Sequence, residues 1–364
     1  MRCARTLVLG LALAAWPAGA DNLPRARPAE LHPGLRVEYG SLPVADGVRL
    51  RTILTRPENA PRPPVILFVQ WLSCDSIELD PDDDGGWTQM LRGVVRRSGW
   101  AVMRTEKRGV GDSEGGPCSS LDYETELADH AAALASLRQR SDVDTRRIVV
   151  FGASMGSRMA PQVGAGVPGV VGIMTWGGGS KTWFERMLAF DRHALELGGT
   201  APADVTSRMK AQTRFHVQYL IEGRNPDAII AADPPLAGVW SGIVGTAADS
   251  HYGRPFAFHQ QAQRADWAAA WGRVTVPALV VMGAFDWFEN AEGHETSVRA
   301  ANRNEPGVAR LEIIPRMDHH FTLFDSAEAA FRGQGGRADA GPFLRLALPW
   351  LGARAVTADA DAEG

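Results

Sequence analysis

Short runs of consecutive apolar residues alternate along the chain with segments of helical periodicity. The run Pro64–Gln70 is apolar almost throughout, which is typical of a strand buried on both faces of a sheet. Tyr123–Arg140 instead places apolar residues three or four positions apart, as an amphipathic helix does. The same patterns predict strands at Trp100–Thr105, Ile148–Phe151, Val167–Thr175, Pro277–Gly283 and Ala309–Ile314, and helices at Trp87–Arg97, Ser297–Arg303 and Phe343–Leu351.

Alternating strands and helices predict an α/β fold with a mostly parallel central sheet and helices on both of its faces. Two segments at the start, Leu35–Val44 and Val48–Thr55, flank the turn residues Asp46 and Gly47 and predict a hairpin. The alternation stops between residues 180 and 271, where the pattern is helical, as in Trp183–Leu197 and Val205–Glu222. We interpret this stretch as a helical cap insertion over the carboxyl ends of the strands.

These boundaries divide residues 21–364 into a core and three other segments. Residues 35–179 and 272–352 form the predicted core, and residues 180–271 form the cap. A Pro-rich extended arm covers residues 21–34, and a polar, flexible tail covers residues 353–364.

The composition is that of a globular protein, with 45% hydrophobic and 22% charged residues among 364. The net charge of −4 provides no basic excess for a phosphate backbone, which argues against a nucleic-acid partner. The sequence does not predict an oligomeric state.

The first 20 residues have the pattern of an export signal. Arg2 and Arg5 precede a short apolar run, and the small residues Ala18 to Ala20 form an A-x-A cleavage site. We therefore expect a secreted or periplasmic protein that begins at Asp21 and keeps no stable membrane anchor. The mature chain then has two cysteines, Cys74 and Cys118, which an oxidising compartment favours as a disulfide.

The motif Gly152-Ala153-Ser154-Met155-Gly156 fits the pattern G-x-S-x-G. An apolar strand ends just before it and a helical segment follows, which is the context this nucleophile turn requires. The following helix should direct backbone N–H groups toward a developing oxyanion. Pro161 lies inside that helix and is expected to bend or end it.

A serine nucleophile needs a base, and the base needs an acid that holds its tautomer. Asp286 follows the strand Pro277–Gly283, so it is the predicted acid, with Glu289 and Glu292 as spare candidates. Two adjacent histidines, His319 and His320, follow the last strand, and either one fits the position of the base.

Taken together, the strand-to-helix turn GASMG (residues 152–156, here called the elbow), the segment GAFDWF and the segment MDHHF resemble the α/β-hydrolase superfamily, over roughly residues 35 to 351. The turn Arg108–Ser113 resembles the R-G-x-G-x-S turn of that superfamily, and Tyr252–Pro255 is similar to a segment of secreted bacterial serine hydrolases with esterase- or peptidase-like activity. The resemblance implies the α/β-hydrolase fold and favours His319 over His320 as the base.

The resemblance also implies an oxyanion hole. Its donors would be the backbone N–H groups of Met155 and of Leu72, with Trp71 as the alternative to Leu72. This chain reads Gln70-Trp71-Leu72 where many relatives carry His-Gly, which implies a bulkier acyl pocket.

A second serine motif needs an alternative interpretation. Gly111–Pro117 resembles the GDSGGP stretch of trypsin-like proteases with one inserted glutamate. Those enzymes need a histidine and an aspartate before the serine on an all-β fold, and only His32 precedes Ser113 in the mature chain. This interpretation is therefore disfavoured.

The leading functional prediction is hydrolysis of a carboxylic ester through Ser154, His319, Asp286 and an acyl-enzyme, without a metal or organic cofactor. A serine peptidase or aminopeptidase and an acyltransferase are alternatives on the same fold, and a non-enzymatic binding module is a further, disfavoured one. A peptidase should offer acidic residues from the insertion to a free amino terminus, for which Glu185, Asp191 and Glu196 are candidates.

Overall fold

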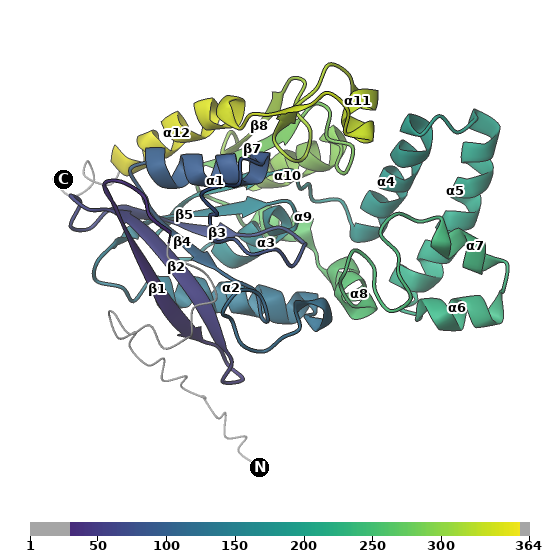
Figure 1. Ribbon diagram of the computed structural model, residues 1–364, viewed down its shortest axis with the longest axis horizontal. Helices are drawn as coiled ribbons and strands as arrows, with labels where there is room; N and C mark the ends of the chain where they lie inside the picture. Colours follow the sequence, from purple (N-terminus) through teal and green to yellow (C-terminus); the bar gives the residue numbers. More distant parts are fainter. Residues whose placement is uncertain (1–29, 357–364) are drawn as a thin grey trace, which may run out of the picture.

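The computed structural model describes residues 30–356, which contain an eight-stranded sheet in the order β1-β2-β4-β3-β5-β6-β7-β8 (Figure 1). The strand order places β5, which leads into the serine motif, at an inner position of the sheet. The strands are β1 (Leu35–Pro43), β2 (Arg49–Pro57), β3 (Pro64–Val69), β4 (Ala101–Thr105), β5 (Asp144–Ala153), β6 (Val170–Trp176), β7 (Ala278–Gly283) and β8 (Ala309–Ile314).

The two ends of the sheet differ in strand direction. β1 pairs antiparallel with β2 through a hairpin, as predicted, and Gly47 supplies the positive φ of 83° that its turn needs. β2 also pairs antiparallel with β4, and every pairing from β4 to β8 is parallel. The carboxyl ends of these parallel strands therefore share one edge, where loops from distant parts of the sequence meet.

Helices cover both faces of the sheet because the inner strands are apolar on both sides. In β3, Val65 and Leu67 join the core on one face, and Ile66 and Phe68 join the core on the other. Helices α1 and α12 pack on the second of these faces, and α2, α3, α9 and α10 lie on the first (Figure 1). These helices are α1 (Gly86–Arg97), α2 (Tyr123–Leu137), α3 (Met155–Gly164), α9 (Trp267–Gly272), α10 (Ala291–Asn304) and α12 (Gly341–Val356).

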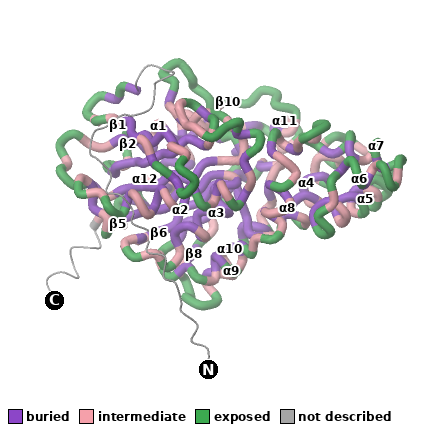
Figure 2. Tube along the Cα trace, turned by 90° about the horizontal axis from the view of Figure 1, so that it is seen from below, coloured by how far each residue is buried: buried purple, intermediate pink, exposed green. Residues whose placement is uncertain are grey.

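A helical cap stands beyond the carboxyl edge of the sheet, at one end of the elongated molecule (Figures 1 and 2). Buried residues follow the strands, and the outer loops of the cap are exposed (Figure 2). The cap comprises α4 (Trp183–Leu197), α5 (Pro202–His216), a short π-helical turn η2 (Val217–Ile221), α6 (Pro226–Ala232), α7 (Leu236–Ser241) and α8 (Phe256–Arg264). The remaining small elements are η1 (Cys118–Ser120), β9 (Thr322–Leu323), α11 (Ala327–Arg332) and β10 (Arg337–Ala338).

Two predicted boundaries differ from the structure. Helix α9 was assigned to the insertion, but it packs against α3 and α10 because Trp267 and Trp271 are buried in the core. The flexible tail was expected from residue 353, yet α12 continues to Val356, since Arg354 lies over the Trp350 ring and the carbonyl of Ala355 accepts a hydrogen bond from Arg147. Pro161 is expected to bend or end α3, and the helix ends at Gly164, less than one turn after it.

The described part of the N-terminal arm is packed rather than free. Glu30 is buried, and its carboxylate lies 2.7 Å from the guanidinium of Arg104 in β4. The predicted signal at residues 1–20, the rest of the arm at 21–29 and the last eight residues of the tail lie outside the described residues. Between residues 30 and 356, no helix has the length and apolar character needed to cross a membrane.

Candidate active site

The serine of the G-x-S-x-G motif occupies a sharp turn between β5 and α3. Ser154 has φ 54° and ψ −117°, a backbone conformation that residues other than glycine rarely adopt. β5 ends at Ala153 and α3 begins at Met155, so Ser154 is the single residue between strand and helix. This geometry lifts its hydroxyl out of the sheet edge.

The two glycines of the motif are required by close backbone contacts. A Cβ atom on Gly152 would lie 2.1 Å from the carbonyl oxygen of Gly156. A Cβ atom on Gly156 would lie 2.0 Å from the carbonyl oxygen of Val69, at the end of β3. Because real Cβ atoms are not found so close to backbone atoms, neither position has room for a larger residue.

A chain of hydrogen bonds connects Ser154, His319 and Asp286. The Nε2 atom of His319 lies 3.0 Å from the Oγ atom of Ser154, and its Nδ1 atom lies 2.7 Å from Oδ2 of Asp286. Asp286 follows β7 and His319 follows β8, so both come from loops at the carboxyl edge of the sheet. The backbone N–H groups of Phe288 and Glu289 donate to the other oxygen of Asp286, which fixes the carboxylate.

The environment of His319 changes its basicity. Burial lowers the pKa of the imidazole, but the charge of Asp286 and its hydrogen bond raise the pKa more, so the net pKa lies above the ordinary value. His319 is therefore a stronger base than a free histidine, as a proton acceptor for a serine hydroxyl should be.

The structure separates the two adjacent histidines. The side chain of His320 is 49% exposed and lies 3.4 Å from Asp318, whereas His319 points to Ser154. The spare acids are engaged elsewhere: Glu289 binds two arginines, and the exposed Glu292 pairs with Lys181. Asp286 is thus the carboxylate next to the base.

Two backbone N–H groups beside Ser154 have no internal acceptor. Neither Leu72, after β3, nor Met155, at the start of α3, donates its N–H to any other group of residues 30–356. Both residues line the same cavity as Ser154. The first turn of a helix leaves such donors free and carries a partial positive charge. Both N–H groups are therefore available as donors to a group bound in this cavity.

The cavity over Ser154 has a volume of about 760 Å³ and lies between the sheet edge and the cap. Aromatic rings surround the imidazole: the ring of Trp87 lies 5.7 Å and that of Phe288 lies 5.1 Å from the ring of His319. Trp71 also lines the cavity. The wall near the reacting groups is therefore largely apolar.

A buried charge cluster lines the cavity on the cap side, and sequence reasoning missed it. The carboxylate of Glu289 lies 3.0 Å from Arg158 of α3 and 2.9 Å from Arg186 of α4. Two cations hold the pKa of Glu289 at about 2 against the opposing effect of burial. The spacing of Ser154 and Arg158, one helical turn apart, was the available signal, because it places both on one face of α3.

The second serine motif has a structural role. Ser113 donates to the carbonyl of Glu106 and accepts from the N–H of Arg51, with no histidine hydrogen-bonded to it among the described residues. Arg108 of the same turn binds Asp129 of α2. The protease-like interpretation of this segment is therefore not supported.

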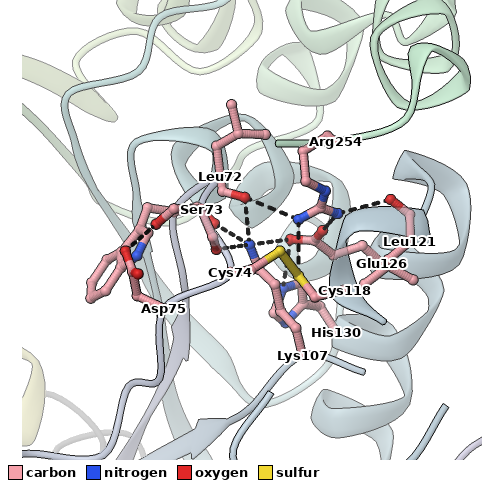
Figure 3. The surroundings of a disulfide bond; sticks show 11 residues. Leu72, Ser73, Cys74, Asp75, Lys107, Cys118, Leu121, Glu126, His130 and Arg254 are labelled. Atoms are coloured by element: carbon pink, nitrogen blue, oxygen red, sulfur yellow. Dashed lines mark hydrogen bonds and ion pairs between the residues drawn. A yellow bond between two sulfur atoms is a disulfide. The ribbon is translucent and has the colours of Figure 1, made fainter. Parts of the chain in front are cut away.

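Cys74 and Cys118 form a disulfide, with their Cα atoms 5.9 Å apart. It joins the loop after β3 to η1, next to Arg254 and Lys107 (Figure 3). Within residues 30–356, no three His, Cys, Asp or Glu side chains are grouped so that they could hold a metal ion.

Sequence comparisons agree with this architecture. The family model described as serine aminopeptidase, S33, matches residues 83–326, about two thirds of the chain. Among curated proteins, an α/β-hydrolase domain-containing protein of Arabidopsis thaliana (WAV2) is 34% identical over 112 residues, covering 31% of this chain and 32% of the relative. The quorum-quenching protein AidA of Acinetobacter baumannii is 40% identical over 140 residues, covering 37% of this chain and 38% of the relative. The matched segments span about a third of the Arabidopsis relative and little more than a third of AidA.

Solved structures share the fold at low sequence identity. An esterase of Pyrococcus furiosus superposes with a TM-score of 0.51 at 11% identity, covering 90% of this chain and 95% of the esterase. A hypothetical protein of Pseudomonas aeruginosa gives a TM-score of 0.54 at 14% identity, covering 89% of this chain and 95% of its own. These matches confirm the predicted α/β-hydrolase fold.

The chain belongs to the serine aminopeptidase S33 family of the α/β-hydrolase superfamily, as the resemblance implied. The description of that family, serine aminopeptidase, is that of a class of serine hydrolases.

Proposed function

We propose that the protein hydrolyses a carboxylic ester through Ser154, His319 and Asp286. Ser154 Oγ attacks the ester carbonyl carbon and its proton moves to His319 Nε2. The carbonyl oxygen, now an oxyanion, accepts hydrogen bonds from the N–H groups of Leu72 and Met155. His319 then gives the proton to the departing alcohol, and an acyl-enzyme remains.

Water completes the cycle by the same groups. His319 takes a proton from a water molecule, whose oxygen attacks the acyl carbon. A second oxyanion forms and collapses, Ser154 recovers its proton from His319, and the carboxylic acid leaves. The carboxylate of Asp286 stabilises the imidazolium that forms twice in each turnover.

The observation that carries this proposal is the continuous contact from Ser154 Oγ through His319 to Asp286, next to two free N–H groups. Ser154 and the Met155 N–H come from the turn after β5, and the Leu72 N–H, Asp286 and His319 come from the loops after β3, β7 and β8 at the same sheet edge. A protein that only binds a ligand would not need a nucleophile, a base, an acid and oxyanion donors in one place.

The placement of acidic side chains favours an ester over a peptide with a free amino terminus. Glu185 caps α4, Asp191 pairs with buried His216, and Glu196 pairs with Arg192, and none of the three lines the cavity. Glu289, which does line it, is held by two arginines and carries no spare negative charge for an ammonium group.

A peptidase is the second candidate, because the description of the matching family is serine aminopeptidase. Three carboxylates of the loop after β3 line the far rim of the cavity, namely Asp75, Glu78 and Asp83. Each already accepts a hydrogen bond: Asp75 from Ser73, Glu78 from Tyr39 of β1, and Asp83 from the N–H of Gly85. An amino terminus would have to displace these partners.

The assay that separates these functions uses p-nitrophenyl esters of graded acyl length beside aminoacyl anilides. We expect ester turnover by the wild type that exceeds anilide turnover, and a loss of about 10³- to 10⁴-fold or more in Ser154→Ala. Turnover of anilides alone would favour the peptidase, and ester transfer to an added alcohol in preference to water would favour the acyltransferase. Full esterase activity in Ser154→Ala would refute the proposal.

We also propose that the protein is exported and acts outside the cytoplasm. The signal pattern at residues 1–20 supports export, and the Cys74–Cys118 disulfide is typical of oxidising compartments. Amino-terminal sequencing of protein from an extracytoplasmic fraction should find Asp21 first. Full-length chain in the cytoplasm would contradict the proposal.

A further inference from the structure

Behind the loop that carries Leu72 lies a single buried ammonium group. Lys107, which follows β4, donates from Nζ to the carbonyl oxygens of Trp71, Leu72 and Ser73, at 3.0 Å for Leu72 and 2.9 Å for Ser73 (Figure 3). Its side chain is only 1% exposed. Three consecutive carbonyl groups therefore point to one cation on the side of the loop that faces away from the cavity.

This arrangement fixes the direction of the Leu72 N–H. A trans peptide unit is planar, and its C=O and N–H bonds point in opposite directions. Because the carbonyl of Trp71 points to Lys107, the N–H of Leu72 in the same peptide unit points away from Lys107. That N–H has no acceptor among residues 30–356, and Leu72 lines the cavity with Ser154.

The ammonium group is held in turn by α2 and by the cap. Glu126 of α2 lies 3.2 Å from Lys107 Nζ and also binds Arg254. Arg254, from the segment before α8, donates to the carbonyl of Leu72 at 3.0 Å and to that of Leu121 at 3.1 Å. The loop carbonyl of Leu72 thus has two cationic donors, one from the core and one from the cap.

The charge state of Lys107 is compatible with this role. Burial lowers its pKa to about 8, and Glu126 opposes that shift while Arg254 adds to it. At neutral pH the side chain is mostly an ammonium group with three donors. The disulfide at Cys74 anchors the same loop one residue further along (Figure 3).

We propose that Lys107 is a positioning residue for the oxyanion hole. Its ammonium group orients the Trp71–Leu72 peptide so that the Leu72 N–H faces the substrate carbonyl at Ser154. Glu126 and Arg254 hold that ammonium and the loop together. The inference rests on the proposed function, because it concerns the donor that the ester mechanism uses.

The kinetic test compares variants of two adjacent cations, the buried Lys107 and the partly buried Arg108, which also pairs with the exposed Asp46. Lys107→Met removes the donors to the loop, and Arg108→Met removes a cation that pairs with Asp129 on the same helix, α2, but contacts no loop carbonyl. For Lys107→Met we expect kcat per labelled active site to fall about 10- to 100-fold with KM within threefold, since the donor is misdirected rather than deleted. Arg108→Met should keep both parameters within threefold.

A second measurement follows the loop itself and does not need a substrate. Hydrogen–deuterium exchange of peptides covering residues 70–75 should accelerate in Lys107→Met and stay at the wild-type rate in Arg108→Met. If Lys107→Met does not fold, Lys107→Gln keeps a shorter donor and should give a smaller change of the same sign in both measurements.

The outcomes separate this inference from the proposed function. Equal kcat in Lys107→Met and Arg108→Met, or unchanged loop exchange in Lys107→Met, overturns the positioning role. A wild type that hydrolyses no ester refutes the proposed function, and the exchange experiment then still decides whether Lys107 orients the loop.

Discussion

The Nε2 atom of His319 lies 3.0 Å from the Oγ atom of Ser154, although 165 positions separate the two residues in the sequence. Strand β6 pairs with β5, which leads to Ser154, and Gly177 follows directly after β6. A Cβ atom on Gly177 would lie 2.9 Å from the imidazole ring of His319. Parallel strands bring the two loops to the same edge, and the glycine leaves room for the ring between them. The contact between nucleophile and base is therefore a product of the sheet topology.

The pH dependence of ester hydrolysis should report His319. Only the neutral imidazole accepts the proton of Ser154, so activity should fall as the pH drops through the pKa of His319, which lies above the ordinary 6.5. In Asp286→Asn the charge that raises this pKa is gone while burial still lowers it. The acidic limb of kcat/KM should then move to lower pH, and kcat should fall by about 10³- to 10⁴-fold.

Profiles of kcat/KM between pH 5 and 9 for both proteins measure this shift. An acidic limb that stays in place in Asp286→Asn would show that another group sets the pKa of the base.

The elbow glycine should be intolerant of even one methyl group. In Gly156→Ala the new Cβ meets the Val69 carbonyl at 2.0 Å, a backbone atom that cannot rotate away. We expect the free energy of unfolding to fall by about 3 kcal/mol or more. Gly352→Ala, at an exposed position of α12, is the control: no atom lies within 4 Å of its Cβ, so alanine should stabilise that helix by about 0.5–1 kcal/mol.

Urea unfolding of the two variants beside the wild type gives both values. Equal stability of Gly156→Ala and the wild type would show that the β3 end and α3 can move apart.

Glu289 should matter for stability rather than as the acid partner of His319. In Glu289→Gln the buried cations Arg158 and Arg186 lose their counter-charge, which should cost about 3–5 kcal/mol of unfolding free energy. At temperatures where it stays folded, the variant should keep kcat within about tenfold of the wild type. The control Glu292→Gln removes an exposed partner of Lys181 and should leave the melting temperature and kcat unchanged.

Thermal melts and ester kinetics of both variants provide the comparison. A loss of kcat in Glu289→Gln as large as that in Asp286→Asn would mean that the acid has been assigned to the wrong carboxylate.

Much of the core could be predicted from the sequence because the patterns that indicate it lie within short segments of the chain. Buried parallel strands such as β3 are apolar at every position, and the elbow between Gly152 and Gly156 needs small residues at fixed spacing. The order of Ser154, Asp286 and His319 follows from the topology that such a sheet imposes. The choice between His319 and His320 rested on resemblance, because adjacent residues have the same local pattern.

The features that the sequence did not predict depend on contacts between segments that are distant in the sequence. Helix α9 reads as part of the insertion, yet buried Trp267 and Trp271 place it in the core. No pattern near Lys107 shows that its ammonium reaches three carbonyls of residues 71–73, and none near Arg254 shows that the cap donates to the same loop. Long charged side chains have several possible partners, and only the folded chain selects one.

The most direct test of the central claim is to find which residue a serine-directed probe modifies. The purified wild type is incubated with a fluorophosphonate, digested, and analysed by mass spectrometry, with Ser154→Ala and Ser113→Ala as parallel samples. We predict a single adduct on Ser154, lost in Ser154→Ala and retained in Ser113→Ala. No adduct on the folded wild type, or an adduct that persists in Ser154→Ala, would contradict Ser154 as the nucleophile.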